Sequence, residues 1–368
     1  MTIETRAPVE PPDRTVESCV IDKVELSSQS IRANPTPAFV PHDLYFLLSL
    51  PGLVPIAAFV DTRYWPAICR VFARLSPVGR TRRKSVRTGV EKAFAGDDSV
   101  DGATVDRICE QLEAQRFELG LQVLRGLLRP NWRPAVRLDG ADRLASAVAD
   151  GRGVILWISR CAFADTIAKI GLASAGYSPV HLSRTNHGFS HSRFGIRWLN
   201  PLQRRMEDRY LAERVIVNDA APSGALRRLQ RVLAKKGIVS IAVEPWGTHV
   251  ADVRILRVRL RIATGAPSLA WKTGARLMPV FVTRESVNGG FRIVVDEPLP
   301  IDREHSRRDA QKSATAEYAS RLERYLRAAP AEWRDWPRVR ALAGRSCARR
   351  DRGPSPGRMP HDRDVARP

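Results

Sequence analysis

The chain has few cysteines and lacks the short motifs that mark many catalytic and nucleotide-binding sites. Its five cysteines lie far apart and form no CxxC pair. That spacing argues against zinc and against a disulfide framework, and it favours a reducing cytoplasm. No Walker loop, GxGxxG, GxSxG or HExxH occurs, so nucleotide-binding, serine-hydrolase and zinc-protease functions lack support. The first 38 residues have no apolar core, and we do not expect a signal peptide there.

Acidic residues are scarce relative to basic ones. The chain has 60 lysines and arginines against 39 acidic residues, a formal net charge of +21. A surface of that charge attracts polyanions such as nucleic acid or an anionic membrane. The arginines are scattered, and no zinc-finger spacing, RNP-like aromatic run or recognition-helix pattern accompanies them. We therefore expect an anionic membrane surface or head group as the partner, and rank nucleic acid well below it.

The composition of the 368 residues, 43% hydrophobic and 27% charged, is typical of a globular protein with a full α/β core. We divide the chain into four regions. Residues 1–40, rich in Pro, Ser, Thr and charge, are predicted to be a disordered tail. Residues 41–150 are predicted to be a helical, membrane-contacting region, residues 151–344 an α/β domain, and residues 345–368 a disordered basic tail.

The most apolar stretch is DLYFLLSLPGLVPIAAFV at 43–60. It has about the minimum length of a membrane span, but two prolines and a glycine at 51–55 interrupt it. A membrane anchor, an interfacial helix pair and a buried core hairpin would each fit. Because Tyr64 and Trp65 end the stretch and a basic run follows at 80–84, we favour membrane contact.

The α/β part is predicted to be a mixed sheet flanked by helices. Residues 154–158 form a continuous apolar run that predicts a buried parallel strand, and helical spacing follows from 163 to 170. Further strands are predicted at 178–182, 214–217, 237–243, 276–283 and 291–295, with an exposed or edge strand at 254–261. Residues 65–128 show a helical pattern, within which one long helix is predicted at 108–124. Further helices are predicted at 141–148, 198–206, 223–236, 264–273 and 311–326.

Polar residues follow four of the predicted strands. They are Arg160 with Asp165, Arg184 with His187 and His191, Glu244 with His249, and an arginine-rich run before Thr264. Open α/β sheets bind ligands at the carboxyl ends of their strands, where free N–H groups and helix dipoles point into a crevice. Together the four clusters predict an active-site crevice, although each cluster alone also fits a solvated loop.

Several short sequences occur in order between about residues 43 and 340. They are GRGVIL at 151–156, LSR at 182–184, RFG at 193–195, IATGAPSLA at 262–270, TGA at 273–275, PVF at 279–281, PAEW at 330–333 and RVR at 338–340. No single piece is specific, but their order and spacing resemble the bacterial lipid A biosynthesis acyltransferases. This is the lauroyl/myristoyl transferase family of the lysophospholipid acyltransferase superfamily, and PAEW with RVR looks like its C-terminal Pro-Glu-x-Trp signature.

The resemblance implies an acyltransferase-like fold and a reaction. A fatty acyl group would pass from an acyl thioester, carried by acyl carrier protein or coenzyme A, to a hydroxyl of a lipid or glycolipid at the cytoplasmic face of the inner membrane. In that family the His of an H-x4-D/E motif takes the proton of the acceptor hydroxyl, and the carboxylate orients the His. No metal or bound cofactor is implied. Arg184 and Arg193 would bind the anionic head group or the thioester carrier, and Glu244 falls at an acidic position of the family.

The chain departs from that motif at its central residue. Aligned on Asp165, the position of the motif His holds Arg160, which gives R-x4-D. A guanidinium keeps its proton near neutral pH, so Arg160 cannot be a general base. We expect it instead to pair with Asp165 or to bind an anion.

Three hypotheses follow. In the first, another base substitutes, with His187 the first choice ahead of His191 and His249, although each also fits a surface histidine. In the second, the fold survives as a catalytically silent binder of anionic lipid, with Arg160 holding a phosphate. In the third, Cys161 is an acyl-accepting nucleophile whose pKa is lowered beside an arginine at a helix amino terminus; a lone cysteine there also fits simple packing. Acyl transfer is the leading function, and the silent binder is the main alternative.

Overall fold

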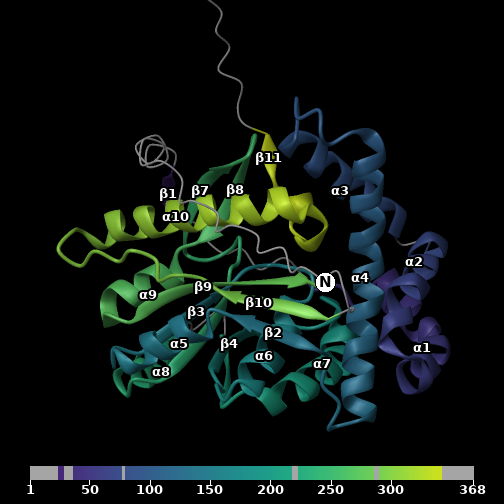
Figure 1. The fold of residues 1–368 in the computed structure, drawn as a ribbon, viewed down its shortest axis with the longest axis horizontal. Coiled ribbons are helices and arrows are strands. Elements are labelled where there is room, and N and C mark those ends of the chain that lie inside the picture. Colours follow the sequence, from purple (N-terminus) through teal and green to yellow (C-terminus); the bar gives the residue numbers. More distant parts are fainter. Residues whose placement is uncertain (1–23, 29–35, 77–78, 218–222, 286–289, 342–368) are drawn as a thin grey trace, which may run out of the picture.

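The computed structural model describes residues 24–28, 36–76, 79–217, 223–285 and 290–341. Over these ranges the protein is mixed α/β, with helices around two sheets (Figure 1). The fold class expected from the sequence is therefore confirmed at this level. The predicted basic tail at 345–368 lies outside the described residues, as does most of the predicted tail at 1–40.

The larger sheet holds the centre of the protein. Within the described ranges it has seven strands in the order β2-β10-β9-β3-β6-β4-β5. Their bounds are β2 (Val136–Asp139), β10 (Phe291–Val295), β9 (Arg276–Arg284), β3 (Val154–Ile158), β6 (Ile238–Ala242), β4 (Val180–Arg184) and β5 (Glu213–Val217). The strands from β9 to β5 are parallel to one another, whereas β10 is antiparallel to β9. The carboxyl ends of β3, β4 and β6 consequently meet at one edge.

Strand β3 has helices on both sides, which explains its uninterrupted apolar sequence. All five of its residues are buried. Its side chains alternate between two cores. Ile155 and Trp157 face the core that includes α8 (Ser223–Ala234), α9 (Gly265–Thr273) and α10 (Arg307–Ala328). Val154, Leu156 and Ile158 face the core that includes α5 (Ala141–Ala149), α6 (Ala164–Ser174) and α7 (Asn200–Glu207).

The smaller sheet corrects two predictions. Its order is β1-β7-β8-β11, with β1 (Glu25–Ser28) paired to β7 (His249–Ile255). Disorder over residues 1–40 is therefore wrong for the four residues of β1. The predicted single strand at 254–261 is instead a hairpin between β7 and β8 (Val258–Ala263), in which Ile255 faces Val258. The turn between them holds Leu256 at φ +51° without a glycine or asparagine, so no turn signal marks it in the sequence.

The helical region stands beside the larger sheet. Helix α4 (Gly102–Leu128) is its longest element, with α1 (Pro41–Phe59) and α2 (Trp65–Leu75) on its outer side and α3 (Gly79–Ala93) near one end (Figure 1). Residues 41–150 are predicted to be helical, but strand β2 lies among them and pairs with β10. The sheet therefore begins before residue 151.

Helix α1 is one continuous helix, so the interruption predicted at 51–55 is wrong. Pro51 and Pro55 lie within it, and both are exposed. The inner face carries Leu53 and Ala57, which are buried in a core shared with α2 and α4. Packing along α4 therefore holds the helix together where the two prolines lack N–H donors.

Residues 330–341, which we call the C-terminal strap, follow α10 and return to the turn after β3. The N–H of Ala162 donates to the carbonyl of Glu332 at 2.7 Å, and the N–H of Arg334 donates to the carbonyl of Arg160 at 3.2 Å. Trp336 of the strap is fully buried, edge-to-face with Trp333 at 4.8 Å between ring centroids. These contacts place the strap beside the first predicted polar cluster.

The packing of the strap against α3 can be tested at Gly89 of that helix. A Cβ atom at this position would overlap the backbone carbonyl of Trp336 in the strap. We expect Gly89→Ala to lower the free energy of unfolding by about 1–3 kcal/mol, because the strap must shift. Gly102→Ala, at the start of α4 with no atom near the new methyl group, is the matched control and should be neutral or slightly stabilising. Urea unfolding measures both, and equal effects of the two changes would contradict the prediction.

Candidate functional site

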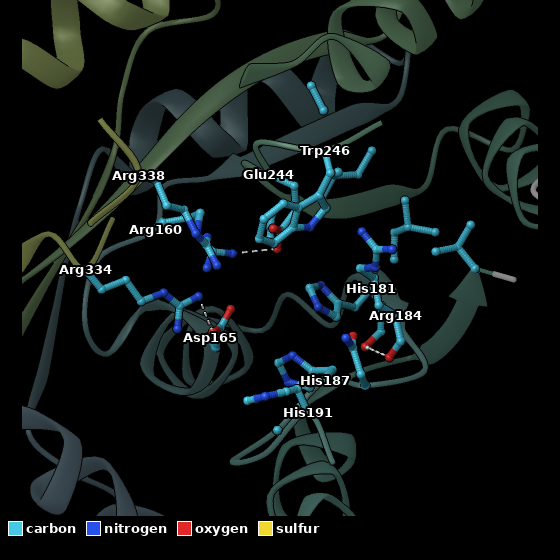
Figure 2. Close-up of a pocket in the computed structure, with 18 of the residues that line it drawn as sticks. Arg160, Asp165, His181, Arg184, His187, His191, Glu244, Trp246, Arg334 and Arg338 are labelled. Carbon is cyan, nitrogen blue, oxygen red and sulfur yellow. Dashed lines mark hydrogen bonds and ion pairs between the residues drawn. The ribbon is translucent and has the colours of Figure 1, made fainter. Parts of the chain in front are cut away.

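A cavity of about 1060 Å³ opens at the edge where β3, β4 and β6 end. Among the residues that the sequence singles out, its wall includes Arg160, Asp165, Arg184, His187 and Glu244. Figure 2 shows these side chains around one space, with His191 at its rim. His249, the third candidate base, also lines the cavity, at the exposed start of β7. The predicted gathering of strand exits is confirmed, because these strands are parallel and end together.

Two of the predicted contributors lie elsewhere. Arg193 is exposed and is not among the described residues that line the cavity; its backbone N–H donates to the carbonyl of Pro37 at 2.8 Å. The arginines of the run before Thr264 lie in the smaller sheet, where Arg261 pairs with Asp252 at 2.9 Å. Placing them in the crevice is wrong, because that run forms a hairpin of the other sheet. Thr264 itself lines the cavity.

Arg160 has two carboxylate partners, and Asp165 is not one of them in the described structure. Its Nη1 lies 2.7 Å from Glu244 Oε1, and its Nε lies 2.5 Å from Asp335 Oδ2 on the strap. Burial disfavours the charged guanidinium, but Asp335, Glu244 and Asp165 together raise the pKa of Arg160 above its ordinary value. The predicted pair with Asp165 is replaced because the strap brings its own carboxylate to Arg160.

Asp165 pairs instead with another arginine of the strap. Its Oδ2 lies 2.5 Å from Arg334 Nη2 (Figure 2). Burial alone would raise the pKa of this carboxyl, but Arg334, and after it His187 and Lys169, hold the pKa well below its usual range. Asp165 is therefore ionised at neutral pH, in the first turn of α6 where the helix dipole also favours an anion.

The strap extends this ion-pair network to the mouth of the cavity. Arg338 Nη1 lies 2.8 Å from Asp335 Oδ1, and its guanidinium sits 4.2 Å from the ring centroid of Trp246. Glu244 has one buried oxygen, Oε2, without a hydrogen-bond partner in the described structure. Burial, which outweighs the attraction of Arg160, raises the pKa of Glu244. Three arginines and three carboxylates thus compensate one another here, and Glu244 keeps one acceptor atom for a ligand.

His187 belongs to a second polar network, centred on Glu207. Glu207 is fully buried at the end of α7, and its Oε2 accepts from Lys169 Nζ at 2.6 Å, Arg214 Nη2 at 2.9 Å and His187 Nε2 at 2.9 Å. Burial opposes its charge, but Lys169, His187 and Arg214 keep the pKa of Glu207 well below its usual value. Because an ionised carboxylate only accepts, Nε2 of His187 carries a proton. A neutral His187 then has its lone pair on Nδ1.

His181 lies beside this network but is buried in the sheet. Its Nδ1 is 2.9 Å from Ser240 Oγ, and its ring centroid is 6.3 Å from that of His187. Burial first, and then the charges of Lys169 and His187, lower the pKa of His181 well below its ordinary value. His181 is therefore a neutral support for its neighbours at neutral pH.

Cys161 does not have the lowered pKa that the third hypothesis requires. Its side chain is buried, and its backbone forms a bridge with Trp333 of the strap. Burial raises the pKa of the thiol to about 12, so almost no thiolate is present near neutral pH. The nucleophile hypothesis is wrong for this reason, and simple packing accounts for Cys161.

The sequence reasoning missed the residues that complete both networks: Lys169, Glu207, Arg214, Arg334 and Asp335. Lys169 had a usable signal, because it follows Asp165 by one helical turn on α6. Arg334 and Asp335 directly follow the PAEW motif. Glu207 had no local signal, since its partners come from α6, β5 and the β4 exit. Across the described part of the chain, no group of three or more His, Cys, Asp or Glu side chains is placed to hold a metal ion.

No protein-family model matches this chain, and no curated protein matches it. The resemblance to the lipid A acyltransferases therefore stays a prediction from the order and spacing of the short motifs.

The buried charge of Glu207 can be tested by substitution. Glu207→Gln would leave Lys169 and Arg214 without their carboxylate, and we expect it to lower the free energy of unfolding by about 3–5 kcal/mol. Glu213→Gln is the control, because its surface pair with Arg228 should contribute at most about 1 kcal/mol.

A comparison of Glu207→Gln with the wild type also tests the pH dependence. A folded-state pKa below the unfolded value, about 4.3 for Glu, stabilises the fold above that pH and loses the effect as pH falls through the folded pKa. The wild type should therefore lose stability below about pH 4, and Glu207→Gln should lose less over that range. Urea unfolding at several pH values measures this, and parallel curves for the two proteins would contradict it.

Proposed function

We propose that this protein transfers a fatty acyl group from an acyl thioester to a hydroxyl of a lipid or glycolipid acceptor, with His187 as the general base. The observation that carries the proposal is the bond between His187 Nε2 and the buried carboxylate of Glu207, at 2.9 Å on the cavity wall. A carboxylate that holds one ring nitrogen fixes the tautomer and stabilises the imidazolium formed when the other nitrogen takes a proton.

In the proposed acyl transfer, His187 carries the proton from the acceptor hydroxyl to the leaving thiol. Nδ1 of His187 takes the proton of the acceptor hydroxyl as its oxygen attacks the thioester carbonyl. The carbon–sulfur bond then breaks, and the thiol leaves with the proton that His187 returns. Glu207 stays ionised throughout and stabilises the imidazolium, while Lys169 and Arg214 hold the carboxylate in place. His187 thereby replaces the motif His whose position Arg160 occupies.

The shape and lining of the cavity fit an amphiphilic substrate. The part of the wall formed by α1 and α4 carries a group of apolar and aromatic side chains: Tyr45, Phe46, Leu53, Leu112 and Phe117. The part near β4 and β6 carries Arg184, whose guanidinium is 6.0 Å from the ring centroid of Trp246. An acyl chain suits the first part, and an anionic head group or carrier suits the second. This division supports an acyltransferase-like fold and the resemblance to the lipid A acyltransferase family.

The outer face of α1 and α2 supports a location on the cytoplasmic face of the inner membrane. Leu48 is 70% exposed and Phe59 84% exposed on α1, and Leu75 is 74% exposed on α2. Arg70 and Arg74 are exposed on the same helix as Leu75. Helix α1 is the one helix in the described residues that is long and apolar enough to span a bilayer. Since its inner face packs on α4, we propose that it lies in the interface with its outer face in lipid.

The alternative, a catalytically silent binder of anionic lipid, is favoured by a different observation. Arg160 and Asp165, at the two motif positions, each have charged partners from the strap, so neither is available as a base. If His187 only supports the fold, the cavity would hold a lipid without reacting with it.

Turnover separates the two functions. With acyl thioester and native lipid extract in detergent, His187→Gln should lower the rate by about 10²–10⁴-fold, the usual contribution of a general base. His305→Gln, at an exposed histidine that is not among the described residues lining the cavity, should not change it. Acyl transfer is measured by labelled product. The silent binder would be favoured instead if the wild type bound lipid without turnover and Arg160→His gained activity.

Vesicle flotation tests the membrane face. Leu48→Glu with Phe59→Glu should greatly reduce binding to vesicles containing anionic lipid, because two charges would enter the apolar interface. Ile216→Glu, at an exposed position of β5, is the control and should bind like wild type. Added salt should weaken wild-type binding if the net positive charge contributes. Unchanged binding of the double variant would exclude this face as the contact.

A further inference from the structure

A second group of basic side chains lines the cavity, and the proposed reaction does not use it. Arg82 comes from α3, Arg116 from α4 and His42 from α1. Arg82 has no carboxylate within ion-pair distance in the described structure. By contrast, Arg160, Arg334 and Arg338 each have a carboxylate at 2.8 Å or closer.

The positive charge of Arg116 is also only weakly balanced by a neighbouring carboxylate. Its Nη1 lies 3.6 Å from Glu113 Oε2, and its Nη2 lies 3.2 Å from His42 Nε2. A guanidinium only donates, so Nε2 of His42 accepts, and the proton of this ring is on Nδ1. Burial, and next the charge of Arg116, lower the pKa of His42 to about 4. His42 is thus neutral at pH 7 and positions Arg116 without adding charge.

The two guanidinium groups repel each other across a partly desolvated space. Burial is the largest cause of the lowered pKa of Arg82, about 9. The charges of Arg116 and Arg334 act in the same direction, and those of Glu113 and Asp335 oppose them. Such a site gains free energy from an anion that pairs with both cations. Glu113 alone does not supply this pairing, since it lies on the Arg116 side at 3.6 Å.

We propose that Arg82 and Arg116 bind a phosphate group of the amphiphile that occupies this cavity. Planar guanidinium groups match phosphate oxygens in pairs, and apolar side chains of α1 and α4, among them Phe46, Leu112 and Phe117, line the same cavity for an attached acyl chain. The inference deepens the proposed function, and rests on it for treating the cavity as the substrate site. The phosphate could belong to a lipid head group or to the carrier of the thioester, and the experiment distinguishes these sources.

The test is a binding titration in nonionic detergent, followed by calorimetry. The probes are lysophosphatidic acid, a monoacylglycerol of the same chain length, and coenzyme A, which has phosphates but no acyl chain. The variants are Arg82→Gln and Arg116→Gln, with Arg82→Lys to restore the charge. Arg80→Gln, an exposed arginine of α3 that does not line the cavity, is the matched control. Thermal unfolding checks each variant, and removal of a repelled charge should not lower stability.

We expect Arg82→Gln to weaken binding of a phosphate probe about tenfold or more, since one charge-assisted contact is lost. Arg82→Lys should recover part of the affinity, and neither Arg80→Gln nor monoacylglycerol binding should change. Loss for lysophosphatidic acid assigns the site to a lipid head group, and loss for coenzyme A alone assigns it to the thioester carrier. Equal affinity of wild type and Arg82→Gln for both phosphate probes, or no binding of either by wild type, would overturn the proposal.

The outcome is independent of catalysis. His187→Gln should bind the phosphate probe like wild type while losing turnover. Arg82-dependent binding by a protein without turnover would retain this site and reject the acyl-transfer function. Turnover with Arg82-independent binding would retain the function and reject this site.

Discussion

The ion pairs between the C-terminal strap and the turn after β3 are the interaction on which the site depends. Asp335 and Glu244 hold Arg160, and Arg334 holds Asp165, so two positions of one short motif are each tied to residues from near the end of the chain. Backbone bonds from Ala162 and Arg334 fasten the same two segments. Buried charges of this kind are tolerated only when every one has a partner. The strap is therefore part of the site's structure, and its burial of Trp336 against α3 links the helical region to the sheet.

The two polar networks perform different tasks. The strap network compensates Arg160 and Asp165 so completely that neither is free to move a proton, although one oxygen of Glu244 remains without a partner in the described structure. The network of Glu207 leaves Nδ1 of a neutral His187 with its lone pair, because the carboxylate accepts a hydrogen bond from the protonated Nε2. The edge of the larger sheet thus carries both a fixed network of ion pairs and the ring of His187, whose Nδ1 can accept a proton. In the proposed reaction the ion pairs serve binding, and the general base lies at the exit of β4 and not in the turn after β3.

The helical region forms a part of the cavity wall that the sheet does not supply. Helices α1 and α4 contribute apolar side chains to the wall, and α3 and α4 contribute the cations Arg82 and Arg116. On the outer side, α1 exposes apolar side chains, and α2 exposes both apolar side chains and arginines. Helix α4 stands beside the sheet, and α1 and α2, whose outer faces form the proposed lipid surface, pack on its far side (Figure 1). A substrate with an acyl chain and an anionic group would find complementary surfaces in the cavity. The net charge of +21 acts over the whole protein, but the specific sites are these few desolvated arginines.

The sequence by itself determined the local elements and their order. The apolar run of β3 is predicted at its observed bounds, because burial on both faces of a sheet requires uninterrupted apolar residues. The bounds predicted for β10 also match the structure. The gathering of Arg160, His187 and Glu244 followed from parallel strand exits. Only the tertiary structure decided which charges pair, since Asp335 and Glu207 reach their partners across long sequence separations and have no periodic signal. It also decided that α1 continues through its prolines and that residues 254–261 turn back as a hairpin. Packing against α4 and pairing between β7 and β8 override the local signals there.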